Sequence, residues 1–155
     1  LPALSTTLFN LDQATPVSLE LDELWSFVKK KSNKRWIWLA LCKQTLQVVA
    51  SVIGGRGIDT CKQLWANVPA PYKQGIVFTD FWEAYQAVIP TEQHYAVGKD
   101  SGLTAHVERF NNTLRQRLAR FVRKSLSFSK SDHMHLISLH AFLVRYNLDI
   151  LAGSL

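Results

Sequence analysis

The sequence predicts a single mixed α/β domain in which helices cover both faces of a five-stranded sheet. Two observations lead to this fold class. The 155 residues are 47% hydrophobic, with five Trp and eight Phe, which suffices for one well-buried core. Strand-like segments come first and are then interleaved with helical segments, an order that combines an antiparallel meander with parallel strands in one sheet. We expect the domain to span residues 17–150, after an arm or linker over residues 1–16.

Three strands are predicted in the first third of the chain. Residues 17–22 alternate apolar and polar side chains, as in a strand with one buried face. A polar hairpin turn at residues 29–34 leads into residues 35–42, which are apolar on both faces and therefore typical of a central strand. Residues 47–53 are rich in β-branched side chains and are followed by two glycines. The three strands should form an antiparallel meander.

Helices and short strands alternate in the middle of the chain. Asp59 is expected to cap a helix over residues 60–67, which ends before two prolines. Residues 75–79 form a short apolar run that is typical of a buried strand. Residues 81–88 are predicted to form a helix, and residues 94–97 a fifth short strand.

Two long helices are predicted at the end of the chain. A turn at residues 100–102 precedes residues 103–124, whose apolar side chains recur every three or four positions, as in an amphipathic helix. After a break at residues 125–131, Asp132 is expected to cap a last helix that extends to Tyr146. The order β-β-β-α-β-α-β-α-α fits the ribonuclease H-like architecture. The apolar stripe of the first long helix consists of Val107, Phe110, Leu114, Leu118 and Phe121.

The charge distribution favours nucleic acid as a binding partner. Eighteen Lys and Arg against twelve Asp and Glu give a net charge of +6. The excess is concentrated in residues 109–130, where no acid occurs, and in residues 29–35. Two distant cysteines without a CxxC pair argue against a zinc ribbon or a disulfide framework. The cysteine usage fits a reducing cytoplasm, and no signal peptide or apolar run of membrane-spanning length occurs, so we expect a cytoplasmic protein, associated with the nucleoid, without a membrane partner.

Three acidic residues occur in settings that suggest a shared site. Asp22 lies on the first predicted strand, Asp80 ends the fourth, and Glu108 opens the long helix. Because the first and fourth strands of such a sheet are commonly neighbours, we expect these carboxylates to converge at one end of the sheet. Converging carboxylates repel each other unless a cation binds, and hard oxygen ligands select Mg²⁺ or Mn²⁺. Two such ions would activate a water or 3′-hydroxyl and stabilise the leaving oxygen of a phosphoryl transfer.

Simpler explanations compete with this site. An arginine-rich amphipathic helix is most often a solvated face over a core, and a glutamate in its first turn often only complements the helix dipole. Glu23 is a candidate for an alternate ligand. We nevertheless expect strand alternation to place both Glu20 and Glu23 on the face opposite to Asp22, in structural roles.

The segments around these acids carry a family resemblance. They read Leu-Asp-Glu-Leu-Trp-Ser-Phe-Val at residues 21–28, Thr-Asp-Phe-Trp-Glu-Ala-Tyr at residues 79–85, and His-Val-Glu-Arg-Phe-Asn-Asn-Thr-Leu-Arg-Gln-Arg at the start of residues 106–130. In this order they resemble the insertion-sequence-one family of bacterial transposases. The resemblance implies a transposase core of the Asp-Asp-Glu type, in which the three acids are the catalytic residues and hold the metal ions. Such a core cleaves DNA and transfers the strand of an insertion sequence.

A basic helix face and several neighbouring side chains are expected to hold DNA. In related transposases a basic residue seven positions after the glutamate contacts DNA near the active site, and Arg115 occupies that position. Trp82 is the aromatic residue expected to line the DNA path. His106 is expected either to orient DNA or a ligand water, or to cap the helix. Arg56 and Lys99 are expected phosphate contacts. The remaining candidates for DNA binding are Asn112, Arg109, Arg117, Arg120, Arg123 and Lys124.

Three functions are open on the sequence alone. An active transposase would work as a homodimer or larger assembly on transposon ends and target DNA. Members of the resembled family usually carry a zinc finger or helix-turn-helix ahead of the core, and nothing in this chain is expected to form one. A truncated or repurposed DNA-binding or regulatory module without catalysis is therefore the first alternative. A ribonuclease H-like nuclease is the second.

Overall fold

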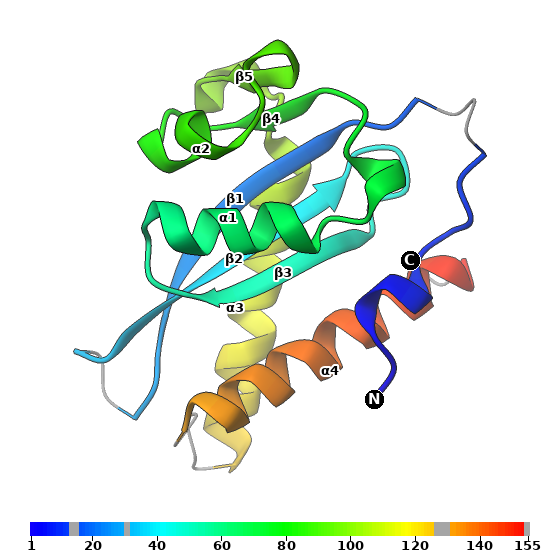
Figure 1. Cartoon of the computed structure of the whole chain (residues 1–155). Coiled ribbons are helices and arrows are strands. Elements are labelled where there is room, and N and C mark those ends of the chain that lie inside the picture. Colours follow the sequence, from blue (N-terminus) through cyan, green and yellow to red (C-terminus); the bar gives the residue numbers. More distant parts are fainter. Residues whose placement is uncertain (13–15, 30–31, 126–130, 154–155) are drawn as a thin grey trace.

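The computed structural model describes residues 1–12, 16–29, 32–125 and 131–153, with the backbone alone for residues 118–125 (Figure 1). The strands of its central sheet are β1 (Leu19–Phe27), β2 (Lys34–Cys42), β3 (Val48–Gly54), β4 (Val77–Thr79) and β5 (His94–Ala96). They lie side by side in the order β3-β2-β1-β4-β5. β2 runs antiparallel to β1 and β3, whereas β4 pairs in parallel with β1 and β5. The predicted mixed five-stranded sheet of a ribonuclease H-like fold is confirmed.

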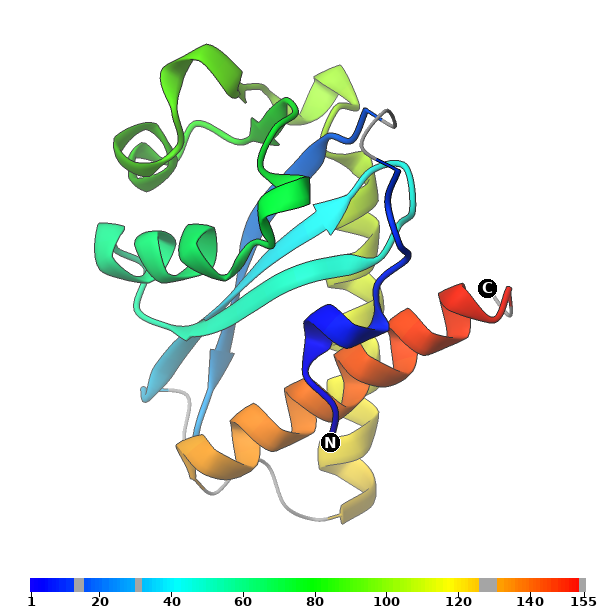
Figure 2. The same cartoon turned by 45° about the vertical axis from the view of Figure 1, so that its right-hand side comes forward.

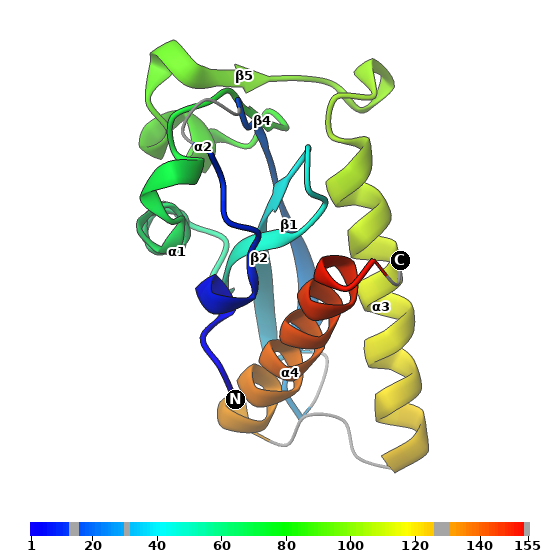
Figure 3. The same ribbon diagram turned by 90° about the vertical axis from the view of Figure 1, so that its right-hand side faces the viewer.

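Helices cover both faces of this sheet, as predicted. The helices are α1 (Ile58–Asn67), α2 (Glu83–Val88), α3 (Ala105–Ser125) and α4 (Asp132–Leu151). Figures 2 and 3 show α1 and α2 on one face and α3 and α4 on the other. β1, α2 and α3 each begin two residues later than the sequence predicts. None of the helices in the described part of the chain combines the length and the apolar character needed to span a membrane.

β2 supplies side chains to two hydrophobic cores, one on each face of the sheet. Trp38 and Ala40 pack into the core under α1 and α2, whereas Ile37 and Leu39 pack into the core under α3 and α4. These four residues are fully buried. Because both faces of β2 are covered, its sequence lacks alternation, and this explains why a central strand could be predicted. The described part of the apolar stripe of α3 enters the second core through Val107, Phe110 and Leu114.

The two predicted helix caps, Asp59 and Asp132, differ from the structure. α1 begins one residue before Asp59, after Gly57, and Asp59 lies in its first turn. Ser131 rather than Asp132 caps α4, because its hydroxyl oxygen accepts a hydrogen bond from the N–H group three residues further on, at 3.1 Å. Asp132 instead forms an ion pair with Nε of Arg35 on β2, at 2.7 Å. Both carboxylates lie inside the first turn, where they complement the positive end of the helix without capping it.

The short 3-10 helix Leu4–Thr7 in the described part of the arm packs against α4 and the outer strand β3 (Figure 1). The buried side chain of Asn147 on α4 binds both the N-terminal segment and β3. Its Nδ2 group donates to Oγ1 of Thr7 at 3.0 Å and to the carbonyl oxygen of Val48 at 2.8 Å, while its Oδ1 accepts from the Val48 N–H at 2.9 Å. The described part of the predicted arm thus packs against the sheet. The boundary between arm and domain stays a prediction.

Candidate active site

A step in the sheet brings distant acidic residues together. β4 pairs with β1 only through Leu19 and Glu20, so the rest of β1 extends beyond its neighbour. Asp80 directly follows the last residue of β4. It therefore lies beside the unpaired edge of β1 that contains Asp22 and Glu23. The carboxyl end of a parallel strand is a common place for ligands in α/β sheets.

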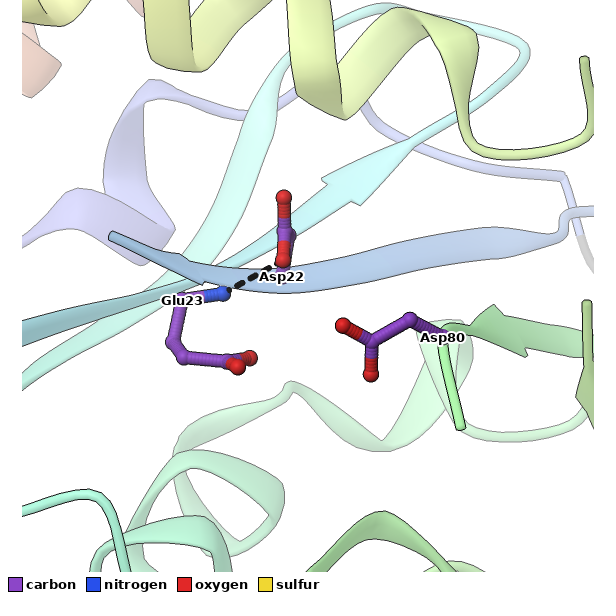
Figure 4. Close-up of side chains that lie close together, drawn as sticks. All are labelled: Asp22, Glu23 and Asp80. Atoms are coloured by element: carbon purple, nitrogen blue, oxygen red, sulfur yellow. Dashed lines mark hydrogen bonds between the residues drawn. The ribbon is translucent and has the colours of Figure 1, made fainter. Parts of the chain in front are cut away.

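Asp22, Glu23 and Asp80 form a compact group, here called the acidic cluster (Figure 4). One carboxylate oxygen from each residue lies within 4.8 Å of the other two. Asp22 points from β1 towards the α3 side, Glu23 extends from the opposite side of the strand, and Asp80 points into the space beside them. Such a set of hard oxygen donors suits Mg²⁺ or Mn²⁺ rather than a thiolate-binding metal.

The carboxylate of Asp22 is only partly compensated by hydrogen bonds. Its Oδ1 accepts from the Glu23 backbone N–H at 2.9 Å, and its Oδ2 accepts from Nδ2 of Asn111 at 2.8 Å. The pKa of Asp22 is raised from 3.8 to about 7, chiefly by burial and then by the negative charge of Glu23. A cation beside this carboxylate would favour its ionised form and lower the pKa again.

Asn111 on α3 is a residue of the site that sequence reasoning missed. It is 3% exposed, and the oxygen of its side chain has no hydrogen-bond partner among the described residues. Its amide nitrogen holds Asp22, so that oxygen lies next to the acidic cluster. The signal was present in the sequence, because Asn111 lies four residues after Val107 and three before Leu114, on the buried stripe of the helix. A polar side chain in that stripe needs a partner.

Glu23 belongs to the acidic cluster, although the sequence suggested a structural role. Its side chain lies on the face opposite to Asp22, as expected. The Tyr85 hydroxyl donates a short hydrogen bond to one carboxylate oxygen, and Nη2 of Arg56 lies 3.3 Å from the other. Burial raises the pKa of Glu23. Its carboxylate still reaches the cluster because β4 ends before Glu23 and leaves this edge of β1 open.

The expected face for Glu20 was wrong, since this residue lies on the same face as Asp22, but its hydrogen bonds agree with the expected structural role. Its Oε1 accepts hydrogen bonds from the backbone N–H groups of His106 and Val107, at 2.9 and 3.2 Å. Its Oε2 lies 2.8 Å from Nδ1 of His106. Residues two apart in a strand point to the same side, so alternation pairs Glu20 with Asp22 and separates both from Glu23. Glu20 thereby caps α3 from outside the helix.

Trp82 connects Asp80 to the loop before α1. The Trp82 backbone N–H donates to Oδ1 of Asp80 at 2.9 Å, and its indole N–H donates to the Arg56 carbonyl oxygen at 2.9 Å. The backbone of Trp82 therefore lies beside the acidic cluster, and its half-buried ring contacts the guanidinium group of Arg56. The predicted contact of Trp82 with DNA stays a prediction, but its position next to Asp80 suits that role.

Glu108 lies near the acidic cluster but outside its close group. It occupies the first turn of α3, is half-buried, and accepts a hydrogen bond from Oγ1 of Thr104 at 3.0 Å. Its negative charge contributes to the raised pKa of Asp22, so the two carboxylates are within electrostatic reach. Within the described part of the chain, the three carboxylates that meet within 4.8 Å are those of the acidic cluster. The role of Glu108 as a metal ligand stays a prediction.

Five of the side chains predicted to bind DNA lie at exposed positions on the described part of α3 and in the turn before it. Arg109, Asn112, Arg115 and Arg117 are exposed, and Nη1 of Arg115 lies 3.4 Å from Oδ1 of Asn112. Lys99 is exposed in the short 3-10 turn that precedes the helix. The other predicted contacts on α3, whose side chains lie outside the described ones, are Arg120, Arg123 and Lys124.

The fold and the acidic cluster define a ribonuclease H-like domain with a candidate metal site at the end of β4. A family model described as IS1 transposase matches residues 16–148 of the chain. The chain belongs to this family, which confirms the resemblance found in the segments around the three acids.

Relatives encoded by insertion elements match most of the chain. It is 36% identical over 127 residues to the "Insertion element iso-IS1n protein InsB" of Shigella dysenteriae, across 82% of this chain and 94% of that protein. It is 39% identical over 119 residues to the "Insertion element IS1 4 protein InsB" of Escherichia coli K12, across 77% and 69%. The "Insertion element IS1 protein InsB" of Shigella sonnei is also 39% identical, across 77% and 88%. Family membership supports a DNA-processing transposase.

Proposed function

We propose that the chain is a catalytic core that cuts DNA at the ends of an insertion sequence and joins the freed 3′-hydroxyl to target DNA. The observation that carries this proposal is the meeting of Asp22 and Asp80 at the end of β4. These residues come from distant parts of the chain and contribute to a partly buried group of like charges. A fold gains no stability from such a group, so its presence indicates a chemical role.

Divalent cations fit the donor set of this site. The close carboxylates repel each other, and the pKa of Asp22, raised to about 7, reflects the cost of ionising it there. We propose that Asp22, Asp80 and Glu108 hold two Mg²⁺ or Mn²⁺ ions, with Glu23 as the nearest further carboxylate. When bound, the ions would supply Lewis acidity at the scissile phosphate and lower the pKa of the attacking water or 3′-hydroxyl.

The side chains of the protein would orient both the site and the DNA. Asn111 and Trp82 hold the carboxylates of Asp22 and Asp80 through hydrogen bonds. The exposed basic side of α3 would bind phosphates, which positions DNA without reading its sequence. We also propose a homodimer or larger assembly on paired ends, at the nucleoid in the bacterial cytoplasm. The proposed DNA contacts are Arg115, Asn112, His106, Trp82, Arg109, Lys99, Arg117, Arg120, Arg123 and Lys124.

The test is Asp80→Asn, which removes one negative charge and keeps an oxygen that can accept from the Trp82 N–H. We expect Mg²⁺-dependent strand transfer of a labelled transposon end into plasmid DNA to fall at least ~100-fold. Affinity for the same DNA should be intact or higher, because one charge that repels phosphates has been removed. Wild-type transfer rates in this variant would contradict the proposal.

Glu108→Gln and Glu23→Gln serve as a matched pair in the same assay. Both changes remove one charge at nearly constant volume, and both residues lie near Asp22. We expect Glu108→Gln to lose as much strand transfer as Asp80→Asn and Glu23→Gln to retain more of it. The opposite order would assign the third ligand position to Glu23.

A further inference from the structure

We propose that Arg56 binds a phosphate of the DNA strand that enters the acidic cluster from the α1 side of the sheet. The inference rests on the DNA-cleaving function proposed above and adds a second phosphate-binding position to it. The helix α3, which carries the other proposed basic contacts, lies on the opposite side of the sheet from α1 (Figure 3). A strand that passes over the end of β4 would therefore meet arginine on both sides of the acidic cluster.

Two tryptophan rings hold the guanidinium group of Arg56. Its central carbon lies 4.5 Å from the ring centre of Trp36 and 4.4 Å from that of Trp82. Contacts of this kind fix the plane of the guanidinium group while leaving its edges free for hydrogen bonds. A pre-oriented arginine loses less conformational freedom when it binds an anion than one on a mobile side chain.

The Arg56 side chain keeps hydrogen-bonding capacity for a ligand. In the described part of the chain, its side-chain contact with a protein acceptor is the 3.3 Å interaction of Nη2 with Oε1 of Glu23. The side chain is 43% exposed. A guanidinium group carries five N–H donors in a fork that matches two phosphate oxygens, so most of these donors are available on the solvent side.

The backbone around Arg56 is held in place relative to the acidic cluster. The carbonyl oxygen of Gly55 accepts from the Trp38 indole N–H at 2.8 Å, and that of Arg56 accepts from the Trp82 indole N–H at 2.9 Å. Trp82 also donates to the carboxylate of Asp80. These bonds connect the arginine to a residue of the acidic cluster, so a phosphate bound by Arg56 would lie at the rim of that cluster.

Neutralisation of Glu23 is the simpler role for this arginine, and the geometry argues against it as the whole explanation. The contact with Glu23 is long and involves a single nitrogen of Arg56. Tyr85 already donates to the other oxygen of Glu23. A residue needed only to neutralise a buried carboxylate would gain from a shorter, bidentate contact with its fork directed inward.

The experiment measures DNA affinity of the full chain over a salt series, without divalent cations, for wild type, Arg56→Gln and Arg56→Lys. We expect Arg56→Gln to weaken binding of a transposon-end duplex roughly 3- to 10-fold. The salt slope, that is, the slope of the logarithm of the affinity against the logarithm of the salt concentration, should become shallower by about one, as for the loss of one phosphate contact. Arg56→Lys should recover part of the affinity. Lys73→Gln is the matched control, because Lys73 also rests on an indole ring, that of Trp65 at 5.3 Å, at the other end of α1.

The double variant Arg56→Gln with Glu23→Gln separates phosphate binding from neutralisation. If Arg56 binds phosphate, the double variant should show the same reduced salt slope as Arg56→Gln alone, because removal of the Glu23 charge does not replace the lost phosphate contact. A single variant with wild-type affinity and slope, or a double variant with the slope restored, would overturn the inference. Since cleavage is not measured, inactivity of the chain as a transposase would leave this result interpretable. Thermal unfolding of each variant checks that it is folded.

Discussion

Glu20 and Asp22 lie two residues apart on the same face of β1, and α3 contacts both, yet their surroundings differ. Glu20 is fully buried and receives two backbone N–H groups and a histidine nitrogen of α3. Asp22 receives one backbone N–H and one side-chain amide, and other carboxylates surround it. Glu20, whose partners all belong to the start of one helix, holds the structure together. Asp22, half-buried among like charges, is ready for a cation.

The largest expected difference between Asp22 and Glu20 is the effect of their substitution on strand-transfer activity. Asp22→Asn is expected to lower Mg²⁺-dependent strand transfer at least ~100-fold, whereas Glu20→Gln should stay within a few-fold of wild type. The reason is that only Asp22 belongs to the acidic cluster. Transfer is measured at a temperature at which circular dichroism reports both variants folded. An equal loss in both variants would end the distinction between a structural and a catalytic acid.

For the stability of the fold, substitution of Glu20 should be more damaging than substitution of Asp22. Glu20→Leu removes the acceptor for two N–H groups at the start of α3, and we expect it to lower the free energy of unfolding by roughly 2–4 kcal/mol. Glu20→Gln, which keeps one acceptor oxygen, should cost less. Urea unfolding monitored by tryptophan fluorescence measures both. If Glu20→Leu were as stable as wild type, the proposed capping of α3 by Glu20 would be unnecessary for the fold.

The smallest expected effect is the pH dependence that Asp22 confers on stability. Because its pKa rises from 3.8 to about 7 on folding, the folded chain holds a proton there that the unfolded chain has already lost. The contribution of Asp22 to stability therefore falls as the pH rises from about 4 to about 7 and is constant above that range. Asp22→Asn should remove this slope and raise stability at pH 8 by roughly 1–3 kcal/mol in a chelator.

Urea unfolding across pH, with and without Mg²⁺, checks this prediction. Added Mg²⁺ should stabilise the wild-type chain more than Asp22→Asn, since a cation compensates the charge that the substitution removes. If the free energy of unfolding changed with pH in the same way for wild type and Asp22→Asn, the raised pKa of Asp22 would be contradicted.

Local patterns account for most of the fold. The uninterrupted apolar run of β2 reflects its burial between two cores, and the three- and four-residue spacing of Val107, Phe110 and Leu114 reflects the packing of α3. The exposure of Arg109 and Arg117 follows from the same periodicity. Each of these features depends on neighbours within a few positions along the chain, so the sequence carries them directly.

The predictions failed where the face of the strand or helix on which a side chain lies was not worked out from the spacing of its apolar neighbours. Glu20 was expected on the wrong face of β1, although residues two apart must share a face. Asn111 is missing from the predicted site, although the apolar stripe of α3 turns it towards the sheet, where it binds Asp22. Both positions could have been read from the spacing of the apolar residues.

The sequence by itself determined the elements, the basic character of α3 and the candidate acids, because propensity, hydrophobic period and composition are local properties. Only the tertiary structure decided which acids meet. Glu23 joins Asp22 and Asp80 because β4 is three residues long and ends before it, and Glu20 is taken up by the first turn of α3. Strand length and register depend on packing across the whole sheet, so no single segment of the chain records them.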